Sequence, residues 1–216
     1  MSGLAAALDT VRARIAAAAR RTGRDPADVT LVAATKTVPA ERVAEAVALG
    51  ATDIGENRAQ ELVDKADALA RMTTAPVCWH FLGRLQRNKV RSLVSRVSWW
   101  QSVDRDALGA TIARHAPEAR VLVEVNLAGE PQKGGCSPAD AGRLTEALRS
   151  LGLRVEGLMT IPPLDDEPRR WFAALRELGA ELGLRHLSMG MTDDYEDAVE
   201  EGATMVRIGR ALFGSR

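Results

Sequence analysis

A lysine follows an apolar segment near the start of the chain. Lys36 comes after five uncharged residues in the stretch LVAATKTVP. A buried ammonium is costly unless it is paired, neutralised or used in chemistry. Lysine forms Schiff bases with carbonyl compounds, and desolvation favours its neutral, nucleophilic amine. We interpret Lys36 as an imine-forming residue. Its partner is then either an aldolase-type carbonyl substrate or pyridoxal phosphate (PLP).

A group of residues near the other end of the chain suits a phosphate. In the stretches SMGMTDD and RIGRALFG, Thr192 offers a hydroxyl, and the amides of Gly209 and Arg210 could donate to phosphate oxygens. Arg207 lies two residues before Gly209, so both share one face of a strand, and we expect Arg207 to point at the ligand. Gly209 as a simple turn glycine is the plain alternative. A phosphate site beside Lys36 favours PLP.

These residues follow the strands of a regular alternation of strands and helices. The expected strands are 31–36, 52–57, 77–83, 99–104, 120–126, 155–162, 186–191 and 204–209. The expected helices lie near 40–49, 58–70, 86–95, 106–114, 168–182 and 194–201, with another starting at Ser137–Pro138. Several strands are near-continuous apolar runs, as in parallel sheets covered on both faces. Eight such units predict an α/β fold, a single (β/α)8 TIM barrel over residues 1–216. A doubly wound open sheet is the alternative, weakened because no GxGxxG follows the first strand.

In a TIM barrel, the residues that end the strands gather at one mouth. The polar side chains in those positions are Lys36, Glu56, Asn57, His80, Asp104, Asn126, Thr160, Ser188, Thr192 and Arg207. The first and last strands of a closed barrel are adjacent, which should bring Lys36 and Arg207 together. Structural roles remain open for others: Asn57 and Asp104 as helix caps, Asn126 as a turn residue, and His80 as a core histidine.

The composition limits the classes of function. The chain of 216 residues has a formal net charge of +0, so nothing overall favours nucleic acid or an anionic membrane. The basic run GRLQRNKVR is interpreted as a solvated helix start. Two cysteines, Cys78 and Cys136, show no CxxC spacing, which predicts neither a disulfide framework nor a metal site and favours the cytoplasm. Cys78 is expected in the core.

The N-terminal segment is rich in alanine and arginine and could pass for a transit peptide. However, Leu4, Leu8, Val11 and Ile15 fall on one helical face. This spacing predicts a helix packed on the barrel, and no apolar run approaches the length of a membrane span.

Seven stretches together resemble one known family. They are ATKTVP, GENRAQE, WHFLGRLQRNK, VNLAGEPQKGG, GLMTIPP, LSMGMTDD and MVRIGRALFG, in that order and over almost the whole chain. The sequence resembles the pyridoxal-phosphate homeostasis proteins, which are similar to the N-terminal domain of alanine racemase. Two departures are visible. The family usually has serine at the position of Thr192, which keeps the hydroxyl, and small or apolar residues are commoner at the position of Arg210.

The resemblance implies a barrel that carries PLP on Lys36 as an aldimine. By similarity to the racemase barrel, Arg207 faces the pyridine nitrogen, while Thr192, Gly209 and Arg210 hold the phosphate. Asn57 is implied as a contact near the ring. The Arg210 side chain is expected to point outward.

A racemase needs a second acid or base opposite the lysine. In the racemases that this chain resembles, a tyrosine from an extra C-terminal domain of a partner subunit supplies it, and we expect no such domain after ALFGSR. The only tyrosine, Tyr195, lies in the acidic stretch TDDYEDAVEE and is expected at the surface. His80 is the best remaining base, but it has no evident orienting partner.

We therefore expect a cytoplasmic PLP carrier or regulator without efficient turnover. Its expected partners are PLP and the amines that could receive it, free amino acids or apo-enzymes. Two alternatives stay open: a PLP-dependent racemase or related enzyme, and a Schiff-base aldolase-type barrel.

Overall fold

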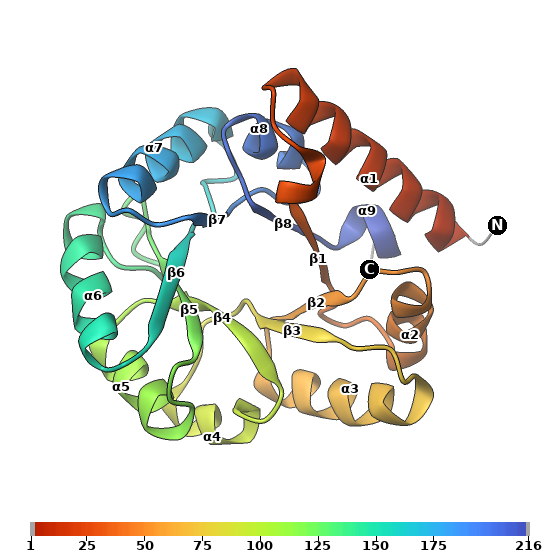
Figure 1. The fold of residues 1–216 in the computed structure, drawn as a ribbon, viewed down its shortest axis with the longest axis horizontal. Helices are drawn as coiled ribbons and strands as arrows, with labels where there is room; N and C mark the ends of the chain where they lie inside the picture. Colours follow the sequence, from red (N-terminus) through yellow and green to blue (C-terminus); the bar gives the residue numbers. More distant parts are fainter. Residues whose placement is uncertain (1–2, 215–216) are drawn as a thin grey trace.

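Eight parallel strands close into a barrel in the computed structural model, which describes residues 3–214 (Figure 1). Each strand pairs with its neighbour in chain order, and the last returns to pair with the first. Within the described range the strands are β1 (Thr30–Ala34), β2 (Asp53–Glu56), β3 (Cys78–Phe81), β4 (Val97–Val103), β5 (Arg120–Glu124), β6 (Arg154–Met159), β7 (His186–Ser188) and β8 (Met205–Ile208). The predicted (β/α)8 fold is confirmed, and the open doubly wound sheet is excluded.

Helices surround the barrel on the outside (Figure 1). In residues 3–214 the α-helices are α1 (Gly3–Arg21), α2 (Ala40–Ala48), α3 (Ala59–Met72), α4 (Val90–Leu93), α5 (Asp106–His115), α6 (Pro138–Ser150), α7 (Pro168–Glu181), α8 (Tyr195–Glu200) and α9 (Arg210–Phe213). Two 3-10 turns, η1 (Pro26–Asp28) and η2 (Arg87–Lys89), complete the set. The helix predicted near 86–95 is thus a 3-10 turn followed by the short α4, with its basic side chains exposed as expected.

The N-terminal helix packs on the barrel as its spacing predicted. Leu4, Leu8, Val11 and Ile15 are all buried, and α1 contacts α8 and α9. Full burial of each such side chain contributes about 1.5–3 kcal/mol. No helix in the described residues has the length and apolar character needed to cross a membrane.

Alternate residues along each strand face the surrounding helices or the barrel interior. The outward-facing side chains belong to the main core, whereas a separate small cluster fills the interior: Val32, Trp99, Leu122, Met159 and Met205. Arg207 pairs in register with Val32 and follows Met205 by two residues, so it also lies on the inner face of β8.

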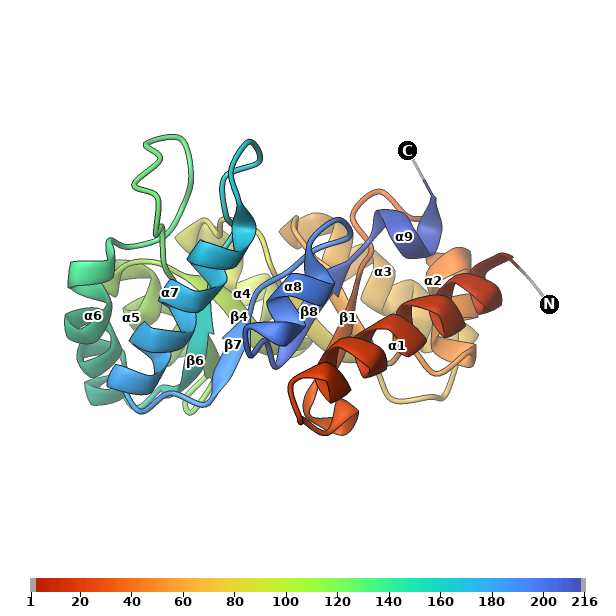
Figure 2. The same ribbon diagram turned by 90° about the horizontal axis from the view of Figure 1, so that it is seen from above.

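Every strand ends earlier than the sequence predicted, and this changes the interpretation of Lys36. Strand β1 ends at Ala34, and the chain then turns, with Val38 N donating to Thr35 O at 2.9 Å and Thr37 at a positive φ of 62°. Lys36 is therefore an exposed residue of this turn and not a buried strand-end lysine. Loops following β5 and β6 rise on the same side of the barrel as α9 (Figure 2).

Candidate functional site

One open pocket lies at the carboxyl end of the barrel, with a volume of about 590 Å³. All six residues predicted for the cofactor line it: Lys36, Asn57, Thr192, Arg207, Gly209 and Arg210. Ala34, Leu82, Ile161, Leu164 and Met191 supply an apolar part of its wall. Because β1 pairs with β8, Lys36 and Arg207 do meet at one site, as the closed topology predicted.

Two side chains of α3 form hydrogen bonds with the backbone of the turn that carries Lys36. Lys65 Nζ donates to the carbonyl of Thr35 at 2.6 Å, and the amide of Thr37 donates to Glu61 Oε2 at 3.0 Å. The Glu61 carboxyl is stabilised as an anion by this amide, which lowers its pKa. Hydrogen bonds thus hold the backbone on both sides of Lys36, at Thr35 and Thr37. The Lys36 side chain is exposed and extends from this turn.

Lys65 also forms a buried ion pair with Glu56, at the end of β2. Glu56 is fully buried, and it additionally accepts a hydrogen bond from the Thr35 hydroxyl at 2.8 Å. Sequence reasoning placed Glu56 in the mouth and missed Lys65. The signal was present, because Leu62, Lys65 and Leu69 share one helical face and all three are buried.

Asn57 is exposed in the pocket, and a close backbone contact holds its segment. A Cβ atom at Gly83 would lie 2.1 Å from the carbonyl oxygen of Asn57, so only glycine fits there. Asn57 does not cap α3, whose N-cap residue is Arg58. Asp104 likewise pairs with Arg105 and caps no helix, so both cap interpretations were wrong. Asn126 does hold its own loop, through bonds of 2.8 and 3.1 Å with the Glu130 backbone.

Arg207 is buried, and two hydrogen bonds fix its guanidinium. It donates to Ser188 Oγ at 2.7 Å and to the carbonyl of Thr160 at 2.8 Å. Burial lowers the pKa of Arg207 to about 10, while the Asp194 and Glu124 carboxylates act in the opposite direction. The group therefore remains cationic at neutral pH and presents a fixed positive charge to the pocket.

A chain of hydrogen bonds runs from Arg207 through the barrel interior. Ser188 Oγ donates to Gln101 Oε1 at 2.6 Å, and Gln101 Nε2 donates to His80 Nδ1 at 2.7 Å. His80 Nε2 then donates to Asp53 Oδ1 at 3.0 Å. His80 is fully buried, and desolvation lowers its pKa against the opposing influence of Asp53.

His80 thus has the orienting partners that the sequence did not reveal. It does not line the pocket, because its place within β3 puts it in the barrel interior. This supports the interpretation of His80 as a core histidine. The partners were hidden because Asp53 and Gln101 come from the neighbouring strands β2 and β4.

Thr192, Gly209 and Arg210 meet where the loop after β7 approaches α9. Gly209 is the N-cap residue of α9, and the amide of Ala211 donates to the Thr192 hydroxyl at 3.4 Å. The first amides of a helix lack intrahelical partners and attract anions. The Arg210 side chain is exposed and pairs with Asp193, so it points outward as expected.

Tyr195 is buried, so its prediction as a surface residue was wrong. It is only 2% exposed and begins α8, while its acidic neighbours Glu196 and Asp197 turn outward to arginines. Its backbone packs against Gly190, where a Cβ atom would lie 3.0 Å from Tyr195 Cα. Tyr195 does not line the pocket either, so it takes no part in this site.

The comparisons with known proteins show the family and agree with the fold. Residues 7–216 match the alanine racemase N-terminal domain. The chain is 46% identical to the pyridoxal phosphate homeostasis protein of Pseudomonas aeruginosa, over 100% of this chain and 97% of that protein. The protein of the same name from Aquifex aeolicus is 44% identical, over 97% of this chain and 96% of the relative. The chain belongs to the pyridoxal phosphate homeostasis protein family.

A solved structure of similar sequence supports the same assignment. PipY of Synechococcus elongatus, determined with PLP bound, superposes with a TM-score of 0.82 and is 36% identical. The alignment covers 94% of this chain and 100% of PipY. The family assignment therefore rests on both sequence and fold over nearly the full chain.

The side chains of the pocket fit a ligand of the PLP type. One primary amine, one hydroxyl, a helix N-terminus and a fixed guanidinium surround the same space. The amine matches an aldehyde, the hydroxyl and the helix N-terminus together match a phosphate, and the guanidinium matches an aromatic ring nitrogen.

Proposed function

We propose that this protein binds PLP covalently through Lys36 and serves PLP homeostasis, holding and releasing the cofactor without efficient turnover. The observation that carries the proposal is the position of the lysines. The chain has four, Lys36, Lys65, Lys89 and Lys133, and of these Lys36 lines the pocket. The PLP bound to PipY and the name of the curated relatives support the choice of ligand.

The surroundings of the other lysines support the same choice. Lys65 is buried in its pair with Glu56. Lys133 donates to the carbonyls of Ile161 and Pro162 at 3.3 and 2.8 Å and pairs with Glu130. Lys89 lies in η2 at the surface, away from the pocket wall.

When bound, PLP would supply an aldehyde that condenses reversibly with primary amines, beside an electron-withdrawing ring. Lys36 would provide the amine that holds it. The hydroxyl of Thr192 and the amides of Gly209 and Arg210 would bind the phosphate, and Asn57 would contact the ring edge. Arg207 would face the ring nitrogen, where a permanent positive charge opposes protonation and so restrains carbanion chemistry.

The pocket wall also supports a carrier over a racemase. Its described lining contains no histidine, tyrosine or cysteine, and its acidic residue, Asp193, is engaged by Arg210. A missing general acid or base typically reduces a rate by about 10² to 10⁴. The open mouth leaves Lys36 exposed, so an incoming amine can reach the site. We infer that residues 1–216 act as one domain in the cytoplasm, with free amino acids or apo-enzymes as recipients.

Borohydride reduction followed by peptide mapping tests the attachment. We expect the reduced adduct on the peptide of Lys36, with loss of the visible absorption in Lys36→Ala. The matched control Lys89→Ala should keep both the adduct on Lys36 and the visible absorption. An adduct on another lysine would refute the assignment, and a colourless protein that traps added aldehydes would instead favour the aldolase alternative.

Activity assays with amino acids test whether the protein turns over substrates efficiently. Racemisation, transamination and decarboxylation are measured across the common amino acids for the PLP-loaded protein and for Lys36→Ala. We expect rates well below about one per second, the low end for ordinary enzymes. A faster rate that disappears in Lys36→Ala would make the protein a true PLP-dependent enzyme.

A further inference from the structure

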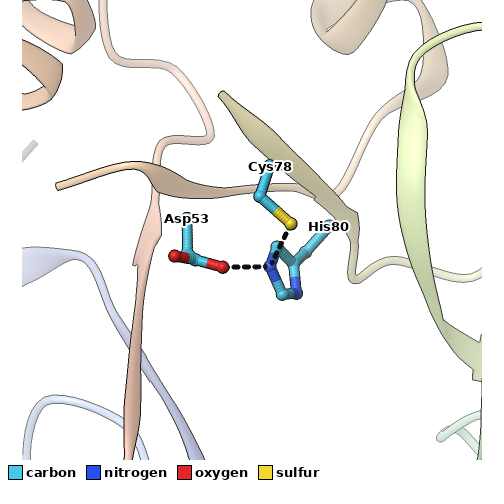
Figure 3. Close-up of side chains that lie close together, drawn as sticks. All are labelled: Asp53, Cys78 and His80. Atoms are coloured by element: carbon cyan, nitrogen blue, oxygen red, sulfur yellow. Dashed lines mark hydrogen bonds and ion pairs between the residues drawn. The ribbon is translucent and has the colours of Figure 1, made fainter. Parts of the chain in front are cut away.

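Three potential metal ligands lie close together (Figure 3). They are the carboxylate of Asp53, the thiol of Cys78 and the imidazole of His80, and their ligand atoms all lie within 4.8 Å of one another. Asp53 and Cys78 are the first residues of β2 and β3, so the cluster lies at the end of the barrel opposite the pocket. Asp53 and Cys78 are direct register partners on β2 and β3, and His80 follows Cys78 by two residues on the same face. Adjacent strands thus present all three groups to one point inside the barrel.

We propose that this cluster is a Zn²⁺ site, with Cys78 Sγ, His80 Nε2 and one Asp53 carboxylate oxygen as ligands and water in the fourth position. Sulfur, imidazole nitrogen and carboxylate oxygen are the ligand types that Zn²⁺ takes in tetrahedral sites. With Zn bonds of about 2.0–2.3 Å, tetrahedral N···S and N···O edges are roughly 3.6 and 3.3 Å.

The distances in the structure are close to those values. Cys78 Sγ lies 3.5 Å from His80 Nε2, and His80 Nε2 lies 3.0 Å from Asp53 Oδ1. Of these two edges, the second must open by a few tenths of an ångström, and the third pair, Cys78 Sγ and the Asp53 oxygen, lies within 4.8 Å. Because Asp53 is partly exposed while the His80 side chain is fully buried, the carboxylate is the ligand that can make this adjustment.

Solvent reaches the Asp53 side of the cluster. A separate cavity of about 480 Å³ at this end of the barrel is lined by Asp53 together with Arg12, Leu31 and Thr52. A hydrated ion in this cavity can therefore meet the Asp53 carboxylate first. The water in the fourth position would lie on the cavity side of the ion.

The surroundings of His80 include the support that a metal-bound imidazole requires. Zinc would take the lone pair of Nε2, so the imidazole proton must move to Nδ1, which faces Gln101. The Gln101 amide then turns so that its carbonyl oxygen accepts a hydrogen bond from Nδ1–H, the role usually played by a carbonyl or carboxylate behind a metal-bound histidine. Cys78 binds as thiolate, so one thiol proton is released for each Zn²⁺ bound.

The local charges are compatible with a divalent cation. Arg120, stacked 3.6 Å from the ring of Trp99, is the cation whose field reaches both Cys78 and His80. The Asp53 carboxylate opposes it. Burial raises the pKa of the Cys78 thiol to about 11, so Cys78 adds a second negative charge once the ion displaces its proton. The sequence showed no such site because zinc spacing rules look for ligands close in sequence, whereas Asp53 and Cys78 meet only across two strands.

A metal titration of the cofactor-free protein, pretreated with a chelator, tests the proposal. Co²⁺ should produce a thiolate-to-cobalt charge-transfer absorption that saturates at one ion per chain, and added Zn²⁺ should abolish it. Removing the cofactor excludes binding through its phosphate. The absence of this absorption in the wild-type protein would overturn the proposal.

Variants assign the ligands. Cys78→Ser should remove the thiolate absorption, while the matched control Cys136→Ser should retain it. Asp53→Asn, at a partly exposed position, should weaken Zn²⁺ binding at least about tenfold and keep the absorption at higher Co²⁺. An absorption that survives Cys78→Ser, or that is lost in Cys136→Ser, would show that the site lies elsewhere and would contradict the assignment.

Discussion

Arg207 on β8 donates a hydrogen bond to the hydroxyl of Ser188 on the adjacent β7, across 2.7 Å inside the barrel. The same hydroxyl donates to Gln101. Ser188 therefore connects the Arg207 guanidinium to the hydrogen bonds that continue through His80 to Asp53. A guanidinium held in this way keeps its orientation before any ligand arrives, which is the condition for a preorganised site.

Replacing Ser188 with alanine should destabilise the protein. A hydrogen bond to a charged group contributes about 1.5–3 kcal/mol, and Arg207 has no solvent to replace it because it is buried. We expect the free energy of unfolding in urea to fall by about that amount. Ser150→Ala, at an exposed position on α6, is the matched control and should change little. Equal changes in the free energy of unfolding for the two variants would show that the Ser188–Arg207 hydrogen bond does not stabilise the protein.

Replacing Thr192 with valine should weaken PLP binding while leaving the fold intact. The change keeps the side-chain shape and removes one donor to the phosphate, which corresponds to about tenfold or more in affinity. Equilibrium binding of PLP measures it, with Thr111→Val, at a half-buried position of α5 away from the pocket, as control. Gly209→Ala should be tolerated less well, since a side chain would occupy phosphate space. Wild-type affinity in both pocket variants would reject the phosphate assignment.

The buried pair of Glu56 and Lys65 should show strong coupling in a double-mutant cycle. Either Glu56→Gln or Lys65→Met leaves one uncompensated buried group, and such losses cost about 3–5 kcal/mol. The double variant removes both charges and should recover much of that loss. Urea unfolding of the four proteins gives the coupling energy. Additive effects would mean that the pair does not act as a unit beneath the Lys36 turn.

Glu124 should make stability depend on pH in an unusual direction. Burial and the nearby Asp104 carboxylate raise its pKa to about 7, against the opposing attraction of Arg207. The folded state therefore holds this proton between the ordinary carboxyl pKa of about 4.5 and pH 7, where the unfolded chain has lost it. Stability from this group is complete below pH 4.5 and is lost as the pH rises to about 7.

Glu124→Gln should remove that dependence. Relative to the wild type, the variant should gain up to about 3 kcal/mol between pH 4.5 and pH 8, because the shift corresponds to roughly that free energy. Urea unfolding of both cofactor-free proteins at several pH values gives the difference, in which the other titrating groups cancel. A difference that is constant with pH would show that Glu124 ionises normally in the folded protein.

Much of the fold could be predicted from the pattern of the chain. Apolar runs alternating with amphipathic segments determine strand and helix order, and eight such units have few ways to bury both faces of a parallel sheet. The stripe of Leu4, Leu8, Val11 and Ile15 likewise predicted a packed helix, because helical periodicity is a local property. The residues of the pocket were predictable because strand ends share one mouth, and all six line it.

Other features depended on contacts between distant segments. Lys36 is exposed because a turn at Thr35–Val38 ends the strand earlier than its apolar run suggests. Tyr195 is buried although its neighbours are acidic, because helix geometry directs adjacent residues to different faces. The partners of Lys65 and His80 come from other strands and loops. The sequence by itself thus determined the order of elements and the chemical groups at the mouth. Only the tertiary structure decided which buried charges are paired and which hydrogen bonds connect Arg207 to Asp53 through the barrel interior. Hydrogen bonds between strands depend on the register of those strands, which the pattern within a single segment does not contain.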